Sequence, residues 1–292
     1  MELLKIIDMK KIRCRLLLLV LFLISCFSKA QNNILPDMVS ASKAYIDTII
    51  KNYTDEDTMS FSPTSLTSTV RIPVVVHIII DNTGQAGVST SDISTSIGTA
   101  NSFFKNIGIL FYIDQTDYIN DYNYAFIRYG NNLKELLSVY PVKNRINLFL
   151  ADSILMGTKR SYGYTCFPDA PDSNYIFLDK KYISGYYLTT MLGHYFGLLS
   201  THDTVGGAEL ASEENCDEAG DFICDTYADP DLYNQVDTTC NYQGAFRDAH
   251  GDFFVPTVAN IMSNSPDECK CDFTPLQYKR MYYYYLKYRQ YP

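Results

Sequence analysis

Basic side chains are scarce in this 292-residue chain, and a quarter of them lie in its first 30 residues. Residues 1–30 hold six of the 24 Lys and Arg residues but two of the 33 Asp and Glu residues, so the remainder carries 18 basic and 31 acidic side chains, a net charge of −13. Nucleic acids and anionic membranes bind through clusters of Lys and Arg. We therefore expect neither as a partner, and we expect the acidic surface to serve mainly solubility.

Hydrophobic runs long enough to cross a membrane are also lacking, so no transmembrane span is expected. The apolar run Leu16–Ile24 is too short for a span, and four basic residues precede it between positions 10 and 15, which is typical of an export signal. Ser28-Lys29-Ala30 fits cleavage after Ala30, the reading we favour, whereas Leu23–Cys26 fits a lipobox that would leave a lipidated Cys26. Either outcome predicts a secreted or cell-surface protein, and the sequence leaves its oligomeric state undetermined.

Histidine is rare as well: the chain has four, and only His194 lies in the frame of a zinc-peptidase helix, HExxHxxGxxH. Aligned on His194 and Gly197, the first ligand position holds Thr190, the general-base position holds Met191 and the third ligand position holds Ser200. In that motif two histidines one helical turn apart bind zinc, and the glutamate acts as base on the bound water. Hydroxyls are poor zinc ligands beside imidazole, and a methionine accepts no proton.

Other motifs show that this frame is not a chance match. An apolar run of strand length, Arg71–Ile80, lies upstream; Cys216-Asp217-Glu218-Ala219-Gly220-Asp221-Phe222-Ile223-Cys224-Asp225-Thr226, Asn260-Ile261-Met262-Ser263 and Phe273-Thr274-Pro275-Leu276-Gln277 follow it. In this order they resemble the pappalysin family of metzincin zinc metallopeptidases, especially its secreted bacterial branch, over roughly residues 71–281. The resemblance implies an α/β metzincin-like fold: a twisted mixed sheet, an active-site-type helix and an irregular, disulfide-stapled lower subdomain that ends in a helix.

The positions at which this chain differs from the family are those of the family's metal-binding and catalytic residues. By the resemblance, His194 stands at the second zinc ligand and Met262 at the Met-turn, while Asn264 replaces a tyrosine that stabilises the oxyanion and Tyr227 replaces a proline. We therefore expect no catalytic residue and no bound zinc, and predict a secreted pseudopeptidase whose cleft binds a peptide or protein.

Two alternatives stay open. The first is an active zinc endopeptidase with a rewired site, using His202 with other histidines or thiols, listed as His77, His250, Cys166 and Cys271. Such a site would have no carboxylate at position 191, where the chain has methionine. It would also have too few nitrogen ligands, since catalytic zinc typically has three protein ligands. The second is a surface-anchored interaction protein that uses its tyrosine-rich C-terminal segment.

Six cysteines follow residue 30, and an even number in an exported chain predicts disulfides: Cys166, Cys216, Cys224, Cys240, Cys269 and Cys271. By the resemblance, four of them occupy family-like places in the lower half. We hypothesise that Cys166 pairs with Cys271 and ties the upper subdomain to the lower one. Structural calcium is a further expectation, because the acidic cluster within residues 213–225 supplies oxygen ligands, listed as Glu213, Glu214, Asp217, Glu218, Asp221 and Asp225.

The chain divides into a signal (1–30), an N-terminal extension and linker (31–70) and a peptidase-like domain (71–292), whose upper and lower subdomains we expect to meet after Gly197. Periodicity predicts helices at 42–51, 91–107 with Ser91 as cap, 132–140, 184–199 and 274–289. Strands are expected at 71–80, 110–113, 124–129, 145–151, 163–167 and 175–178. In the last helix, Tyr278, Met281, Tyr285 and Tyr288 share one face, which favours core packing over an exposed aromatic platform.

Overall fold

The computed structural model describes residues 43–61, 69–128, 132–156, 158–168 and 174–291. Its α-helices are α2 (Lys43–Thr58), α3 (Thr90–Phe104), α4 (Leu133–Val139), α5 (Tyr187–Tyr195) and α6 (Pro275–Tyr288). Its strands are β1 (Val70–Ile79), β2 (Ile109–Ile119), β3 (Phe126–Arg128), β4 (Ile146–Ala151), β5 (Ser153–Met156), β6 (Lys159–Ser161), β7 (Gly163–Thr165) and β8 (Tyr175–Asp179). Short 3-10 turns are η2 (Lys105–Ile107), η3 (Tyr122–Tyr124), η4 (Lys180–Tyr182) and η5 (Asp267–Cys269).

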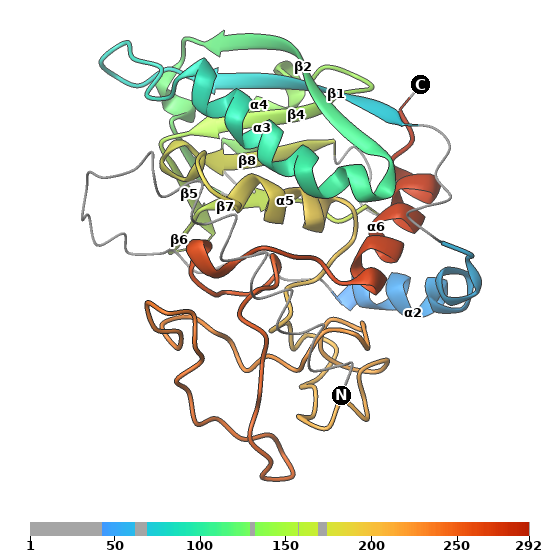
Figure 1. The fold of residues 1–292 in the computed structure, drawn as a ribbon. Helices are drawn as coiled ribbons and strands as arrows, with labels where there is room; N and C mark the ends of the chain where they lie inside the picture. The colour runs from blue at the N-terminus through green and yellow to red at the C-terminus, as the bar shows by residue number, and fades with distance from the viewer. Residues whose placement is uncertain (1–42, 62–68, 129–131, 157, 169–173, 292) are drawn as a thin grey trace. The chain divides into compact units, whose positions relative to one another are not determined.

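A five-stranded sheet in the order β2-β1-β4-β8-β7 forms the centre of the fold (Figure 1). β1 pairs in parallel with β2 and β4, and β4 pairs in parallel with β8, whereas β7 runs antiparallel to β8 and ends the sheet. β1 and β4 read as nearly unbroken apolar runs because helices or loops cover both of their faces. The predicted α/β fold with a twisted mixed sheet is confirmed.

The sheet separates two apolar cores. Along β4, Leu148 and Leu150 point into the larger core, whereas Phe149 and Ala151 point into the smaller one, because side chains alternate along a strand. The larger core also contains residues of α2, α3, α5 and α6. The smaller one contains α4 together with β3 and β5, which belong to a three-stranded sheet ordered β3-β5-β6.

Between α5 and α6 the chain is irregular, and η5 is its one helical turn (Figure 1). Disulfides join Cys216 to Cys224 and Cys240 to Cys269 within it. The predicted disulfide-stapled region that ends in a helix is therefore confirmed. The hypothesis of a Cys166–Cys271 bridge is wrong, because Cys166 is a free thiol. Its sulfur lies 2.9 Å from the hydroxyl oxygen of Tyr175 and 3.4 Å from that of Tyr164, at the end of β7.

α6 begins with a capping box in which the Thr274 hydroxyl accepts from the Gln277 amide and the Gln277 side chain accepts from the Thr274 amide. Met281 is fully buried and Tyr278 and Tyr285 are nearly so, while Tyr288 is 37% exposed. The predicted core-facing side of this helix is thus present for Tyr278, Met281 and Tyr285, whereas Tyr288 is partly exposed.

Several predicted boundaries need correction. The N-terminal helix extends to Thr58, well past the predicted 42–51. Helix α3 is capped by Ser89, whose hydroxyl accepts from the Asp92 amide, instead of by Ser91. β2 continues to Ile119, and the short strands β5 and β6 were not predicted.

The predictions about the export signal, cleavage after Ala30 or a lipid on Cys26, concern residues before position 43 and lie outside the described residues. Within the part of the chain that the structure describes, no helix is both long enough and apolar enough to cross a bilayer.

Candidate functional site

His194, the one motif histidine, lies near the C-terminal end of α5 and is fully buried. Its Nδ1 atom is 2.8 Å from the carbonyl oxygen of Leu198, so Nδ1 carries the hydrogen and donates. A carbonyl partner of this kind orients metal-binding histidines. The ring of Phe167 meets the imidazole edge-on, with 5.8 Å between ring centroids. His194 is therefore held in a fixed orientation beside an aromatic ring.

Thr190 occupies the first ligand position, one helical turn before His194, and is also fully buried. Its hydroxyl donates to the carbonyl oxygen of Ile261 at 3.0 Å and lies 3.3 Å from the carbonyl oxygen of Tyr186. The first bond links α5 directly to the segment that carries Met262. A side chain that would bind a metal in the family motif is here engaged in a bond between two backbone segments.

Met191 occupies the general-base position and has no exposed surface. Its thioether lies against Gly163 of β7: a Cβ atom added to that glycine would sit 2.6 Å from the Met191 sulfur. Because such a contact is too short for any real side chain, the packing requires glycine at position 163 as long as Met191 keeps this place. A thioether in this position accepts no proton from water.

Met262 packs against the opposite side of α5, where a Cβ atom on Gly193 would lie 2.6 Å from its sulfur. The Met262 amide donates to the Asn260 side chain, and the Met262 carbonyl accepts from the Thr201 amide. The Asn260 and Gln277 side-chain amides exchange two hydrogen bonds, of 2.9 and 3.2 Å, which connects this segment to α6. The methionine that the sequence analysis singled out therefore lies directly against the helix of His194.

His202 and Asn264 lie together, although Ser200 and not His202 holds the third ligand position. The Asn264 side-chain nitrogen is 3.1 Å from His202 Nε2 and 2.9 Å from a carboxylate oxygen of Asp231. Since the carboxylate can only accept, the amide nitrogen faces both groups and His202 Nε2 accepts. His202 is thus hydrogen bonded to Asn264, the residue that the sequence analysis aligned with the tyrosine position.

The remaining predicted alternatives for metal ligands are dispersed. His77 lies on β1, where Nε2 is 3.0 Å from the Asn147 side-chain oxygen and the ring stacks on Phe149. His250 lies in an exposed turn, and Cys166 lies at the end of β7. Among the described residues, no three His, Cys, Asp or Glu side chains are grouped so that they could hold a metal ion. The donor set therefore does not fit the zinc ion that the fold family carries.

Sequence reasoning missed one buried acidic residue, Glu209. Both of its carboxylate oxygens are buried without a hydrogen-bond partner, and burial, followed by the charges of Asp221, Glu213 and Asp229, raises its pKa to about 8. Burial likewise raises the pKa of Asp221 to about 7. Of the acidic residues proposed for calcium, Asp221 is the only buried one. No periodic pattern marks Glu209, because it lies in an irregular segment after Gly206 and Gly207.

Comparison with known proteins gives the following likenesses. No protein-family model matches the chain. An extracellular metalloprotease of Sordaria macrospora is 26% identical to it over 246 residues, which cover 77% of this chain and 78% of that protein. An extracellular metalloprotease of Arthroderma gypseum is 25% identical over 258 residues, which cover 82% of this chain and 80% of that protein. Mature mirolysin of Tannerella forsythia, solved in complex with a cleaved peptide, matches in structure with a TM-score of 0.51 at 18% identity, over 74% of this chain and 91% of its own. A second mirolysin structure, in complex with a compound, matches with a TM-score of 0.50.

These likenesses agree with two predictions from the sequence, the metzincin-like fold and the similarity to metallopeptidases. The fold is that of a metzincin-type metallopeptidase, and the sequence is similar to extracellular metalloproteases. That relatives are named extracellular supports the predicted export of this chain.

Proposed function

We propose that this protein is an exported, catalytically inactive member of the pappalysin branch of the metzincins, which binds a peptide or protein along its cleft without cutting it. The observation that carries the proposal is Met191, fully buried at the general-base position and packed against Gly163. A positioned general base contributes about 10²–10⁴ in rate. With Thr190 hydrogen bonded to Ile261 as well, the two positions that would activate a water molecule serve packing and hydrogen bonding instead.

Zinc and calcium belong to this proposal in different ways. We propose that no zinc binds, since Thr190 and Ser200 offer only hydroxyls where imidazoles would be required. Structural calcium near the acidic segment stays a prediction, and added Ca²⁺ should then raise the melting temperature.

We propose the outer edge of β7, which ends the five-stranded sheet, as the site for an extended peptide. The Ser161 hydroxyl already bonds the amide and the carbonyl of Gly163 there, so Thr165 is the residue of this strand whose main-chain groups would take the peptide. The Asp179 amide donates to the Tyr162 carbonyl, so in this antiparallel register Tyr162 and Tyr164 face β8. By alternation, the backbone groups of Thr165 face away from β8. An extended chain that adds to a sheet edge gains main-chain hydrogen bonds from such groups.

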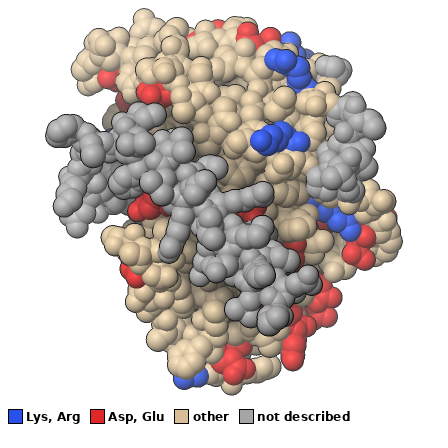
Figure 2. All heavy atoms as spheres, in the orientation of Figure 1, with Lys and Arg blue, Asp and Glu red and all other residues tan. Residues whose placement is uncertain are grey.

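Export in an oxidising compartment completes the proposal. Two disulfides within the described residues fit a secreted protein, where such bonds persist. Among the described residues on the face drawn in Figure 2, Lys and Arg side chains are few and Asp and Glu are spread widely, which favours a partner that is not an anionic polymer or membrane.

The test is to incubate residues 31–292 with a peptide library and to identify by mass spectrometry the peptides that stay bound. The proposal predicts bound peptides of unchanged mass. Thr165→Pro removes an outward N–H and should weaken binding, whereas Thr165→Val removes only the hydroxyl bond to Tyr175 and should not. Cleaved products would contradict inactivity, and equal binding by both variants would contradict the β7 edge as the site.

A further inference from the structure

Helix α2 lies in the predicted N-terminal extension, yet one of its faces is part of the main core. Its buried residues recur at helical spacing and are Tyr45, Ile46, Ile49, Asn52 and Glu56. Tyr45 is 1% exposed and Ile49 is not exposed at all, values typical of core residues. This spacing defines a continuous contact face over the length of the helix.

The N-terminal end of α2 contacts the end of α5. The Tyr45 hydroxyl donates to the carbonyl oxygen of Gly197 at 2.9 Å. Its ring stacks on Phe167 at 4.2 Å between centroids, and Phe167 in turn meets His194. Gly197 adopts φ = 96°, and a Cβ atom there would lie 2.8 Å from the Tyr45 hydroxyl oxygen, so the backbone at the end of α5 is shaped to receive this side chain.

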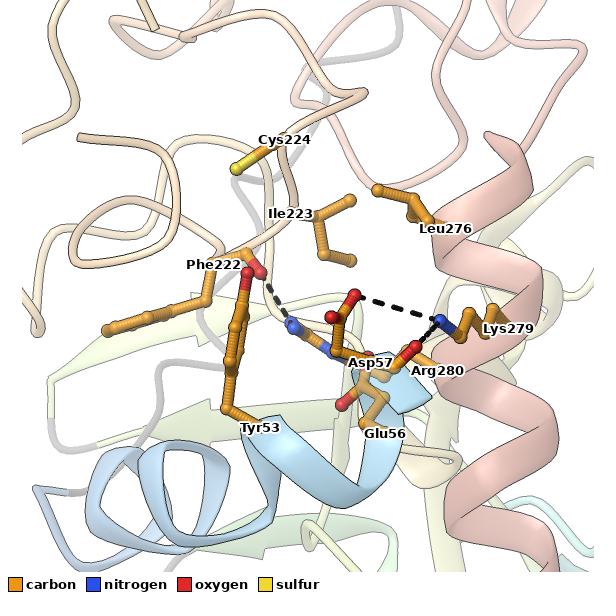
Figure 3. A pocket seen from close by; sticks show the side chains of 9 residues that line it. All are labelled: Tyr53, Glu56, Asp57, Phe222, Ile223, Cys224, Leu276, Lys279 and Arg280. Atoms are coloured by element: carbon orange, nitrogen blue, oxygen red, sulfur yellow. Dashed lines mark hydrogen bonds and ion pairs between the residues drawn. The ribbon is translucent and has the colours of Figure 1, made fainter. Parts of the chain in front are cut away.

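The C-terminal end of α2 is joined to α6 by a buried ion pair. Arg280 Nε donates to Glu56 Oε1 at 2.9 Å, and Arg280 is 1% and Glu56 7% exposed. The other guanidinium nitrogens donate to the carbonyl oxygens of Asp221 and Phe222, each at 2.7 Å. Figure 3 shows this junction at the wall of a small pocket where α2, α6 and the segment of Phe222–Cys224 meet. One guanidinium therefore holds three separate parts of the chain together.

Polar contacts also fasten the middle and the last turn of α2. Asn52 donates to the Tyr288 hydroxyl at 3.1 Å and accepts from Lys287 at 2.8 Å. Lys279 donates to the carbonyl oxygen of Asp57 at 2.6 Å and lies 3.9 Å from an oxygen of its carboxylate, and the two dashed lines at Lys279 in Figure 3 mark these contacts. A lysine that donates a hydrogen bond to a carbonyl oxygen in the last turn of a helix stabilises that end of the helix.

We propose that residues 43–61 form a resident strap: a segment that stays docked as part of the working protein and is not a removable extension. The strap closes over the end of α5 at Tyr45 and supplies the carboxylate that Arg280 needs to hold the irregular segment. Cutting the chain between Phe61 and Thr69 leaves the strap bound. The proposal goes beyond the proposed function and stands whether or not the protein cuts peptides.

The experiment places a specific protease site between Phe61 and Thr69 of the protein spanning residues 31–292, cuts it, and follows both pieces by size-exclusion chromatography and native mass spectrometry. The expected result is one complex in which the piece containing residues 43–61 stays with residues 69–292. Elution of the two pieces apart under native conditions would overturn the proposal.

Two charge-neutralising variants of the same helix test whether the Glu56–Arg280 ion pair holds the strap in place. Glu56→Gln leaves buried Arg280 without its carboxylate, so the cut strap should dissociate at least about tenfold faster. Asp47→Asn changes an exposed carboxylate on the opposite face and should leave dissociation unchanged. Equal rates for the two variants would refute the ion pair as the fastening.

Discussion

At the scale of single residues, Thr189 and Thr190 form a natural comparison within one helix. Both are fully buried on α5. The Thr190 hydroxyl donates to the carbonyl of Ile261, whereas the Thr189 hydroxyl has no hydrogen-bond partner. A buried hydroxyl stabilises a fold only when it is paired, so neighbouring residues of the same type contribute differently.

Thr190→Val should therefore lower the free energy of unfolding by about 1 kcal/mol, because Ile261 would lose the hydrogen bond that links it to α5. Thr189→Val replaces an unpaired hydroxyl by a methyl group and should not destabilise the protein. Urea unfolding of both variants measures the difference. Equal losses would show that the Thr190 bond adds nothing.

Glu209 makes stability depend on pH. Its pKa in the folded protein is raised to about 8 from 4.5, so between these values the folded state holds a proton that the unfolded chain has released. The free energy of unfolding should then fall as pH rises from about 4.5 to about 8, by up to about 1.4 kcal/mol per pH unit for this group.

Glu209→Gln removes this titration, so the variant should gain stability relative to the natural protein as pH rises from 5 to 8. The exposed neighbour Glu214 provides the control, and Glu214→Gln should leave the pH dependence unchanged. Chemical denaturation at pH 5 and pH 8 measures the slope. A Glu209→Gln variant with the natural slope would contradict the role given to this carboxyl group.

At the scale of elements, the two disulfides of the irregular segment close loops of different length. Cys240 and Cys269 are 29 residues apart, whereas Cys216 and Cys224 are eight apart. Restriction of the unfolded chain grows with loop length. Replacing Cys240 and Cys269 by alanine should therefore cost about 1 kcal/mol more than replacing Cys216 and Cys224. Thermal unfolding of the two double variants under oxidising conditions checks this order, and the reverse order would contradict it.

The elements that the sequence predicted well are those with strong local patterns. β1, β4 and β8 are continuous apolar runs, and α6 has a capping box and a regular buried face. β5 and β6 escaped prediction because three or four residues carry no clear periodicity. The length of α2 escaped it because only long-range contacts, such as Glu56 with Arg280, extend the helix beyond residue 51.

The same distinction holds for the candidate site. Motif spacing alone placed Thr190, Met191 and His194 on one helix, as the structure has them. The Tyr45–Phe167–His194 stack and the contact of Asn264 with His202 could not be predicted, since they join segments with no shared pattern. The Cys166–Cys271 hypothesis failed for this reason too: counting cysteines gives no distance between them.

At the scale of the whole molecule, the central question is whether a metzincin fold stands here without its metal chemistry. α5 is held to the Met262 segment by the Thr190 hydroxyl bond and the packing of Met262 on Gly193, contacts that involve no metal ligand. Restoring the zinc-binding and general-base residues of the motif tests whether the scaffold can still hold a metal site.

The most direct test measures zinc per chain by plasma mass spectrometry, together with cleavage of casein and peptides, for residues 31–292 and for a Thr190→His, Met191→Glu, Ser200→His variant. The account predicts that the natural protein is zinc-free and inert and that the restored variant binds zinc, with Asn264 limiting the activity that returns. Stoichiometric zinc and peptide cleavage by the natural protein would contradict it.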